Sequence, residues 1–457
     1  MKKEMYGHEI TVLRDTFRRL LRRHARTNLV KLVQKTHPAD LAVLFRYFTE
    51  EEQLAIFQLF CETEHVDDFI NEVDDSIVTF LLENETPEKI VKIFEFLGSS
   101  DQAFVLGLLS DELSSKVLGL LQAEEQEEVE ELMAYPDDSA GSMMYTDIFT
   151  LHEDTVARDA INAIQDQVDA EMVFYLYVID DDKRLVGVIS LRDLVTTPPE
   201  TPLEDFMIKN VHSVRAETDQ EEVARVVSRY NYVAVPVVDR EDRLLGIVTV
   251  DDVVDVIREE ATEDFLQMAG VGKDREILLK SPWENAKMRL PWLFASWIGG
   301  IVAATIIGVF DHALQSIIAL AAFIPVIIGM GGNIGTQSST IIVRGLATGR
   351  VDFGNEFKIV FKEVQVGLIL GILYGFLLGI FAYFRFMDAP VLLGLVVGLS
   401  IAASMLIATT IGTFVPLFLK KMDIDPAIAT GPFVTTSIDI LGVTFYFMIA
   451  TALLPMA

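Results

Sequence analysis

The chain changes character near residue 288, where mixed apolar and polar positions give way to long apolar segments. Five such segments follow, at about 290–310, 316–343, 363–384, 390–419 and 427–456. Each is long enough to cross the ~30 Å hydrocarbon core of a bilayer as a helix. We therefore predict a five-helix α transmembrane domain over 288–457.

Residues 1–136 show the helical spacing of apolar positions throughout. Short helices that open with Pro or acidic residues recur in pairs, at 38–45 with 50–60 and at 87–94 with 100–109. Such a repeat predicts an all-α superhelical N-domain over 1–136. Its first helix, predicted as one segment over 10–33, is basic and amphipathic. It can touch a membrane or nucleic acid, but we favour a solvated face that meets the acidic remainder.

Residues 137–257 contain two copies of one α/β pattern, at 137–200 and 201–257. Each copy has a hydrophobic strand, an acidic turn, a second strand containing Gly187 or Gly246, and a helix opened by Asp. A Met-containing helix end and a first strand, placed at 147–151 and 211–214, precede these elements. The duplication predicts a tandem α/β pair, which a connecting helix over 258–287 joins to the transmembrane domain.

Charge divides the chain at the same place as hydropathy. The formal net charge is -31 over 457 residues. Basic and acidic residues are equal in number after residue 280, so residues 1–280 carry the whole excess of negative charge. An acidic body of this kind repels nucleic acid and anionic lipid and attracts metal cations. A surface that is acidic only for solubility has the same composition.

The cysteine and the basic residues indicate the location of the chain. Cys61 is the only cysteine, which excludes an intrachain disulfide and a thiolate metal cage and fits a reducing compartment. The N-terminus leads into a charged helix, so we expect no cleaved signal peptide. Basic residues flank the predicted spans mainly on one side. The positive-inside rule then places the N-terminal domains in the cytoplasm and the C-terminus outside, in a bacterial-type inner (plasma) membrane.

Asp439 is the most unusual residue of the predicted spans. Its span has no Lys, Arg or His to neutralise it, and a carboxylate at membrane depth costs roughly 2.5–3.5 kcal/mol on insertion scales. Oxygen donors lie nearby in Thr435, Thr436 and Ser437, a setting that suits a hard cation. A protonated or water-exposed Asp near a helix end is the alternative. We interpret Asp439 as a pore residue.

The second predicted span contains Pro325 and clustered glycines, which weaken a helix and free backbone carbonyls. The glycines also permit close helix packing, and we expect both effects. Packing alone does not account for the polar residues of this span, which are Asn333, Thr336, Gln337 and Thr340.

An acidic run begins at the end of the second α/β copy and continues into the connecting helix. Four of its carboxylates recur at steps of three and four and share one helix face: Asp252, Asp255, Glu259 and Glu263. Like charges at this spacing destabilise a helix by a few tenths of a kcal/mol per pair. Asp219 and Glu221 add to the acidic field. A solvated face explains many such runs, but we favour a cation-sensing face because this one connects the two halves.

The duplicated pattern resembles a tandem pair of cystathionine-β-synthase (CBS) domains. The resemblance rests on 175–195 and 233–254, where the strands end in Gly-Val-Ile and Gly-Ile-Val before an Asp-containing helix. It implies a regulatory module that binds an adenine nucleotide such as ATP. The matching positions are Tyr175 for base stacking and Arg192 with Asp193 at the ribose-phosphate end. Capping of a helix is the alternative role for the last two residues.

The whole chain resembles the MgtE-type magnesium channel family, through its domain order, residues 325–347 and residues 425–439. The resemblance implies a homodimeric Mg²⁺ channel whose cytosolic domains close the pore when internal Mg²⁺ is high. It implies that Asp439 is the central carboxylate, with Gly332, Thr336 and Thr340 opposite. The residues that it implies for Mg²⁺ sensing are Asp219, Glu221, Asp252, Asp255, Glu260, Glu263 and Asp264.

Two other functions stay open. An ion-coupled secondary transporter of divalent cations such as Mg²⁺ or Co²⁺ would need a relay, and the sequence shows no second buried titratable group in the spans. A membrane-anchored CBS sensor of nucleotide or metal would leave Asp439 and the broken second span without a role. The chain has no phosphate-binding loop of the Gly-x-x-x-x-Gly-Lys-Ser/Thr type and no His/Cys metal centre. We therefore expect that it is neither an ATP-driven pump nor another enzyme. The expected partners are magnesium ions, a second copy of the chain and the lipid bilayer, without nucleic acid.

Overall fold

The structure is a computed structural model of the chain. It describes residues 7–63, 65–166, 175–272, 274, 277, 280–351, 354, 356–387, 389–422, 424–429 and 431–454. The chain forms two compact units, Met1–Val256 and Ile257–Ala457. The division falls inside one helix, α14 (Val250–Met268), and each unit is described by itself.

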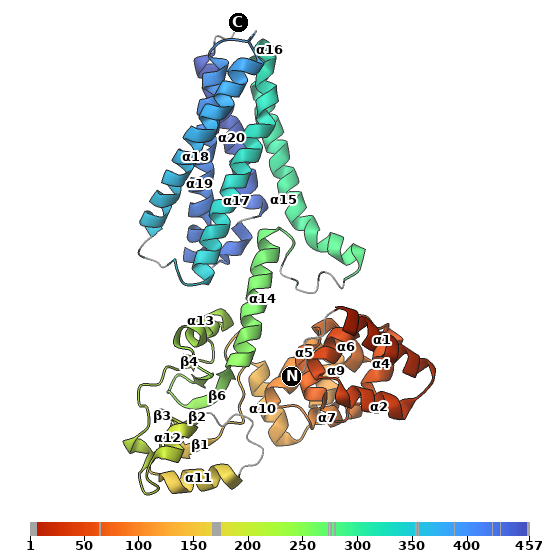
Figure 1. Cartoon of the computed structure of the whole chain (residues 1–457). Helices are drawn as coiled ribbons and strands as arrows, with labels where there is room; N and C mark the ends of the chain where they lie inside the picture. The colour runs from red at the N-terminus through yellow and green to blue at the C-terminus, as the bar shows by residue number, and fades with distance from the viewer. Residues whose placement is uncertain are drawn as a thin grey trace. The chain divides into compact units, whose positions relative to one another are not determined.

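The first part of unit one is helical, as the apolar spacing predicted (Figure 1). Its helices are α1 (Gly7–Arg22), α2 (Arg26–Lys35), α3 (Pro38–Phe45), α4 (Glu50–Phe57), α5 (His65–Glu72), α6 (Asp75–Glu83), α7 (Pro87–Phe94), α8 (Ser99–Leu108), α9 (Asp111–Leu118) and α10 (Ala123–Met133). Phenylalanines fill the core between them. Phe45 packs edge-on against Phe69 at 4.6 Å between ring centroids, and both are buried.

The prediction of one helix over 10–33 is wrong, because α1 and α2 are separate helices. His24 lies between them with a φ of 49°, in the left-handed region. The amides of His24 and Ala25 donate to the carbonyls of Leu21 and Leu20, which ends α1 in a Schellman motif. The basic character of the segment did not reveal this break.

The second part of unit one contains two sheets of the same topology. β1 (Thr150–His152) is parallel to β2 (Tyr175–Ile179), which is antiparallel to β3 (Leu185–Ser190). β4 (Val214–Arg215), β5 (Ala234–Val238) and β6 (Leu244–Thr249) repeat this order. The remaining elements are α11 (Ala157–Asp166), α12 (Leu191–Thr196), the 3-10 helix η1 (Leu203–Asp205) and α13 (Gln220–Tyr230). The predicted duplication is confirmed, although β1 and β4 begin three residues later than expected, where pairing with β2 and β5 begins.

Gly187 and Gly246 occupy equivalent positions in the two sheets and meet equivalent neighbours. A Cβ atom on Gly246 would lie 2.6 Å from the Tyr145 carbonyl oxygen and 2.9 Å from Met144. A Cβ atom on Gly187 would overlap the side chain of Met207. Glycine is therefore required where the Met-containing segment that begins one copy crosses the last strand of the other copy.

The described residues of unit two form five helices long and apolar enough to cross a membrane, which confirms the predicted spans. They are α15 (Pro282–Val309), α17 (Ile324–Ala347) with the preceding 3-10 helix η2 (Ile318–Phe323), α18 (Glu356–Arg385), α19 (Leu393–Lys421) and α20 (Pro432–Leu453). The short helices α16 (Asp311–Ser316) and η3 (Pro426–Ala429) precede η2 and α20. In unit two, α19 packs against α17, α18 and α20.

The connecting helix differs from the predicted 258–287. The acidic helix α14 begins eight residues earlier, at Val250, and ends at Met268. Pro282 begins α15, where Ser281 and Glu284 form a reciprocal capping box. Residues after 281 therefore belong to the first span, because a strong helix start there separates them from α14.

Candidate functional site

Asp439 lies on α20 beside the glycine-containing face of α17. A Cβ atom built on Gly332 would lie 3.9 Å from Asp439 Oδ1. A larger side chain at position 332 would reach the carboxylate. The structure thus brings together the two residues that the family resemblance placed opposite each other.

One face of α17 is polar and not buried within the chain. Asn333 and Thr340 are exposed, and Gly332 and Thr336 are partly exposed. The other side of α17 is packed, with Gly331, Ile334, Gly335, Ser338 and Ser339 all buried. The predicted pore residues of α17 therefore share an open face, and a cation on that face would meet amide and hydroxyl oxygens.

The hydroxyl groups before Asp439 are turned toward their own helix. Thr435 donates to the Gly431 carbonyl at 3.2 Å, and Ser437 donates to the Phe433 carbonyl at 2.7 Å. The Thr436 side chain occupies the space left by Gly299 of α15, where an added Cβ atom would overlap it. Packing against α15 places Thr436 away from an ion-binding role.

Glu363 on α18 is a second buried acidic residue of the spans, and the expectation that none exists is wrong. The residue is 9% exposed. Ser338 on α17 donates a 2.8 Å hydrogen bond to Glu363 Oε2. The signal in the sequence was its position four residues before Gly367, on the helix face that carries the glycines of α18.

The end of α14 contacts the segment that leads into α20. Gln267, 2% exposed, donates a 2.8 Å hydrogen bond to Asp425 Oδ2. Asp425 also accepts from the Ala427 amide at 2.8 Å, which orders η3. The acidic helix therefore ends against the span that carries Asp439.

Asp252, predicted as a sensor, has protein donors on both carboxylate oxygens. Thr249 donates at 2.5 Å from its hydroxyl to Oδ2, and Tyr145 donates at 3.3 Å to Oδ1. Burial of the carboxylate raises the pKa of Asp252 above its usual range. Asp252 also accepts from the Thr249 amide at 3.2 Å, just before α14 begins. In the first copy, Ser190 is the N-cap of α12 and its hydroxyl donates to Asp193 at 2.7 Å. Both aspartates thus bond to the hydroxyl residue that precedes their helix.

Two acidic residues of the helical part act on Tyr145, the hydrogen-bond donor to Asp252, and the sequence did not identify them. Burial raises the pKa of the Tyr145 hydroxyl, and the charges of Asp252, Asp101 and Asp67 raise it further. Asp101 comes from α8 and Asp67 from α5. Three carboxylates separated by up to 185 residues therefore act on one hydroxyl. Their distance along the chain hid this association.

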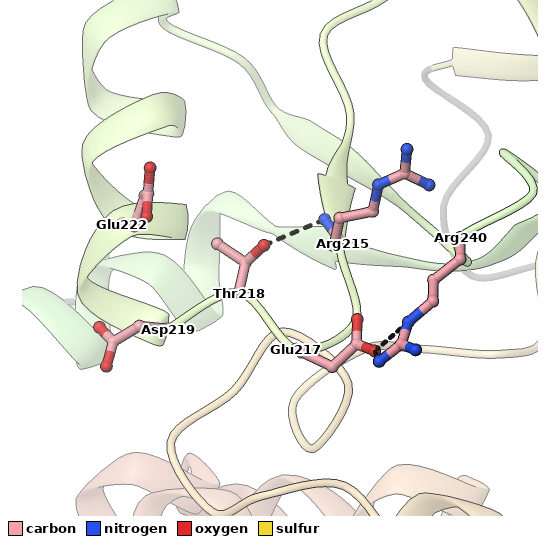
Figure 2. A pocket seen from close by; sticks show the side chains of 6 residues that line it. All are labelled: Arg215, Glu217, Thr218, Asp219, Glu222 and Arg240. Atoms are coloured by element: carbon pink, nitrogen blue, oxygen red, sulfur yellow. Dashed lines mark hydrogen bonds and ion pairs between the residues drawn. The ribbon is translucent and has the colours of Figure 1, made fainter.

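Asp219 caps α13 and lines a pocket, whereas Glu221 pairs within its own helix. Asp219 accepts from the Glu221 amide at 2.9 Å, and Glu221 lies 3.6 Å from Arg225. Figure 2 shows the pocket, of about 630 Å³, at the ends of β4 and β5, where Arg240 pairs with Glu217 at 3.1 Å. Its lining residues are Arg215, Glu217, Thr218, Asp219, Glu222 and Arg240. Neither Glu221 nor Asp252 lines it.

The remaining predicted sensor residues lie along α14: Asp255, Glu259, Glu260, Glu263 and Asp264. All of them take part in interactions within the chain. In the part of the chain that the structure describes, no three His, Cys, Asp or Glu side chains are grouped as a metal site would require.

Tyr175, predicted to stack on a base, lies at the start of β2 beside a group of aromatic residues. Burial raises the pKa of Tyr232, with smaller contributions from Tyr230 and Tyr175. The rings of Tyr230 and Tyr232 stack at 5.5 Å, and His212 stacks on Tyr230 at 4.3 Å. The alternation Tyr-Asn-Tyr just before β5 was the signal for this second aromatic group. Arg192 follows Ser190 in the turn that begins α12.

Family models match the helical N-terminal part, both α/β copies and most of the membrane-spanning part of the chain. The family model MgtE, described as a divalent cation transporter, matches residues 324–449. The MgtE intracellular N domain covers residues 36–138, and the CBS domain matches twice, at 140–200 and 203–259.

Curated and solved relatives agree with these models. The chain is 35% identical to the magnesium transporter MgtE of Bacillus subtilis over 92% of this chain and 93% of that protein. It is 38% identical to the magnesium transporter MgtE of Thermus thermophilus over 73% of this chain and 74% of that protein. The crystal structure of the cytosolic domain of the Mg²⁺ channel MgtE in complex with ATP matches with a TM-score of 0.51 and 32% identity, over 53% of this chain and 99% of that one.

Proposed function

Because this chain belongs to the MgtE family of magnesium transporters, we propose that it is a Mg²⁺ channel with a pore centred on Asp439. The observation that carries the proposal is the approach of Asp439 to Gly332 beside the open polar face of α17. A membrane-embedded carboxylate marks an ion pathway more often than a structural contact.

The chemistry of this face suits a hydrated magnesium ion. Mg²⁺ dehydrates reluctantly and prefers octahedral oxygen ligands at about 2.0–2.1 Å, so it usually keeps several waters. Asp439 supplies negative charge. The exposed side chains of Asn333 and Thr340 can form hydrogen bonds with the waters that the ion keeps. A site with one carboxylate per chain holds the ion without a cage that would stop conduction.

A second copy of the chain completes the proposed pore. The exposed polar face of α17 would be costly against lipid, because its amide and hydroxyl groups would lack partners in hydrocarbon. A homodimer that joins two such faces would cover them and bring two Asp439 carboxylates to one axis. The bilayer then contacts the apolar residues of α15 and α18, such as Leu293 and Ile369, both 65% exposed.

We further propose that Mg²⁺ in the cytoplasm closes the pore through the acidic cytosolic part. Asp252 with Asp101 and Asp67, the carboxylates of α14, and Asp219 with Glu221 are the groups whose mutual repulsion a bound cation would relieve. A ligand shifts an equilibrium only by binding one state better, and relief of repulsion gives the closed state that advantage. The end of α14 lies on Asp425, next to the helix that carries Asp439.

ATP is the second proposed ligand. Tyr175 and the stacked Tyr232 offer aromatic faces for adenine, and Arg192 with Asp193 lies at the turn for the ribose and phosphates. Aromatic stacking with an arginine is a common way to hold a nucleotide. The proposed orientation has the N-terminal domains in the cytoplasm and the C-terminus outside a bacterial-type inner membrane, and no enzymatic step is part of the proposal.

The test is Mg²⁺ flux into proteoliposomes containing the purified protein or its Asp439→Ala variant, with cytosolic-face Mg²⁺ absent or millimolar. Fast flux that Asp439→Ala abolishes and cytosolic Mg²⁺ suppresses supports the proposal. Asp311→Ala removes an exposed carboxylate at the start of α16 and serves as the matched control. Equal flux through wild type and Asp439→Ala, or flux only under an imposed proton or sodium gradient, would overturn it.

A further inference from the structure

Glu363 has no role in the mechanism described so far, yet it is a buried carboxylate in a membrane helix. It lies seven residues after the start of α18, about 10 Å along the helix at 1.5 Å per residue. A carboxylate at such a position is expensive unless polar groups receive it. The Ser338 hydroxyl, itself 2% exposed, is the partner that the structure provides.

The packing of α18 against α19 holds Glu363 in the interior. Glycines follow Glu363 at every fourth position of α18, at Gly367, Gly371, Gly375 and Gly379. Their contacts are close, since a Cβ atom on Gly375 would lie 2.5 Å from the Gly398 carbonyl oxygen. Because Glu363 continues this row, the same packing turns its carboxylate toward the neighbouring helices.

Ser338 lies on the side of α17 away from the pore face. At 100° per residue, Ser338 is about 160° from both Thr336 and Thr340 around the helix. Gly332 approaches Asp439 on the open side, and Ser338 bonds to Glu363 on the packed side. Two carboxylates from different helices thus border α17 on two of its faces.

We propose that Glu363 is a positioning residue of the pore. Through Ser338 it sets the rotation of α17 about its own axis, so that Gly332, Thr336 and Thr340 face Asp439. The inference rests on the proposed function, because it assigns a task within that pore. Glu363 does not itself meet the ion, since its partner Ser338 lies on the packed side of α17.

The chemistry explains why a carboxylate suits this position. A buried hydroxyl and a buried acceptor are both costly to leave unpaired, so Ser338 and Glu363 favour the rotation of α17 that joins them. The low dielectric of the packed interior strengthens their hydrogen bond. The back face of α17 is closely packed, since a Cβ atom on Gly331 would lie 2.7 Å from the Ser404 hydroxyl oxygen. The bond from Ser338 to Glu363 adds a directional polar contact to this packing.

The experiment measures Mg²⁺ flux in proteoliposomes, as a function of external Mg²⁺, for Ser338→Ala, Glu363→Leu, Glu363→Gln and the double variant Ser338→Ala/Glu363→Leu. We expect Ser338→Ala and Glu363→Leu each to raise the KM by about three- to tenfold, and the double variant to be no worse than either, because one bond is lost in all three. Glu363→Gln keeps an acceptor for Ser338 and should restore a KM within about twofold of wild type.

Ser400→Ala is the matched control. Ser400 is a buried serine of α19, 1% exposed, and its hydroxyl has no hydrogen-bond partner among the described residues. Its removal should leave the KM unchanged. A purely structural effect would lower the amount of folded protein and the maximal flux while leaving the KM as in wild type.

The outcomes separate this inference from the proposed function. If the wild-type protein passes no Mg²⁺, both the proposed function and the inference are wrong. If the wild-type protein passes Mg²⁺ and the KM is unchanged in Ser338→Ala and Glu363→Leu, only the inference is wrong. A KM as high in Glu363→Gln as in Glu363→Leu would also overturn it, because the charge and not the hydrogen bond would then matter.

Discussion

Gln267 and Asp425, 158 residues apart, are joined by a 2.8 Å hydrogen bond from the Gln267 amide to the Asp425 carboxylate. The bond ties the last turn of α14 to the segment before α20. Gly431 lies close by, since a Cβ atom on it would be 3.6 Å from both the Gln267 carbonyl oxygen and the Gly270 Cα atom. A movement of the end of α14 therefore acts directly on the segment that leads to Asp439.

A carboxylate in place of Gln267 should weaken this contact. Gln267→Glu sets two carboxylates against each other in a buried position, and like charges that lack a cation there repel strongly. If α14 holds the pore closed, the variant should keep several-fold more Mg²⁺ flux than wild type when cytosolic Mg²⁺ is saturating. Proteoliposome flux against cytosolic Mg²⁺ measures this.

Gln315→Glu is the control for that substitution, because Gln315 makes the same bond to a carboxylate in an exposed place. Its amide donates to Asp311 Oδ2 at 2.5 Å on α16. The change of charge is identical, but solvent screens it. Full closure of Gln267→Glu by cytosolic Mg²⁺, with the same midpoint as Gln315→Glu, would show that the Gln267–Asp425 contact does not take part in gating.

Gly412 should be intolerant of a methyl group. A Cβ atom there would overlap the Gly335 carbonyl, which is backbone and has little freedom to move. Overpacking of this kind costs about 1–3 kcal/mol of folding stability. Gly412→Ala should thus lower the melting temperature of the purified protein by several degrees.

Gly308→Ala tests whether that loss comes from packing. Nothing described in the chain lies within 4 Å of a Cβ atom at Gly308. Alanine is favoured over glycine in a helix by about 0.8–1.0 kcal/mol, so this variant should melt no lower than wild type. Equal destabilisation of Gly308→Ala and Gly412→Ala would contradict the packing argument.

The sequence was sufficient for the spans and for the duplicated sheets. A span is determined by length and hydropathy, and the CBS-type repeat by alternation and turn residues, all of which are local properties. Local patterns did not show the break at His24, because the Schellman motif there uses a histidine where glycine is usual. The connecting helix was predicted to begin at residue 258, after the second α/β copy. Its acidic run already begins at Asp251, one residue after the start of α14.

The candidate site was predicted only where its residues lie close in sequence or on one helix face. Asp439 and the polar face of α17 follow from such patterns. The bond between Ser338 and Glu363, and the approach of Asp67 and Asp101 to Tyr145, join helices whose neighbours the sequence does not specify. The bond between Asp252 and Thr249 was within reach, because Thr249 precedes Asp252 as Ser190 precedes Asp193.

Tyr232 should contribute to nucleotide affinity if its ring stacks on the base. Stacking of a base on an aromatic side chain contributes about 1–3 kcal/mol, so Tyr232→Ala should weaken ATP binding by roughly 5- to 150-fold. Isothermal titration of the purified protein with ATP measures the change. Tyr47→Ala, which removes a 50% exposed tyrosine near α3, is the control. Unchanged ATP affinity in Tyr232→Ala would place the nucleotide elsewhere.

Asp252 should make folding stability depend on pH. Because burial raises its pKa above the ordinary value of 3.8, the folded protein holds the Asp252 proton more tightly than the unfolded chain. The resulting stabilisation is complete below the ordinary pKa and is lost as pH rises through the raised pKa of the folded state. Asp252→Asn does not ionise, so its unfolding free energy should fall less across that interval.

If Asp252 belongs to a sensor, Mg²⁺ should restore the folding stability that is lost as Asp252 ionises. A nearby cation favours the ionised carboxylate, and it binds the folded state alone. At neutral pH, added Mg²⁺ should therefore raise the melting temperature of wild type more than that of Asp252→Asn. Asp251→Asn is the matched control, since Asp251 is the exposed neighbour on the same turn of α14. If Mg²⁺ stabilises Asp252→Asn and wild type equally, Asp252 stabilises the start of α14 and is not a sensor.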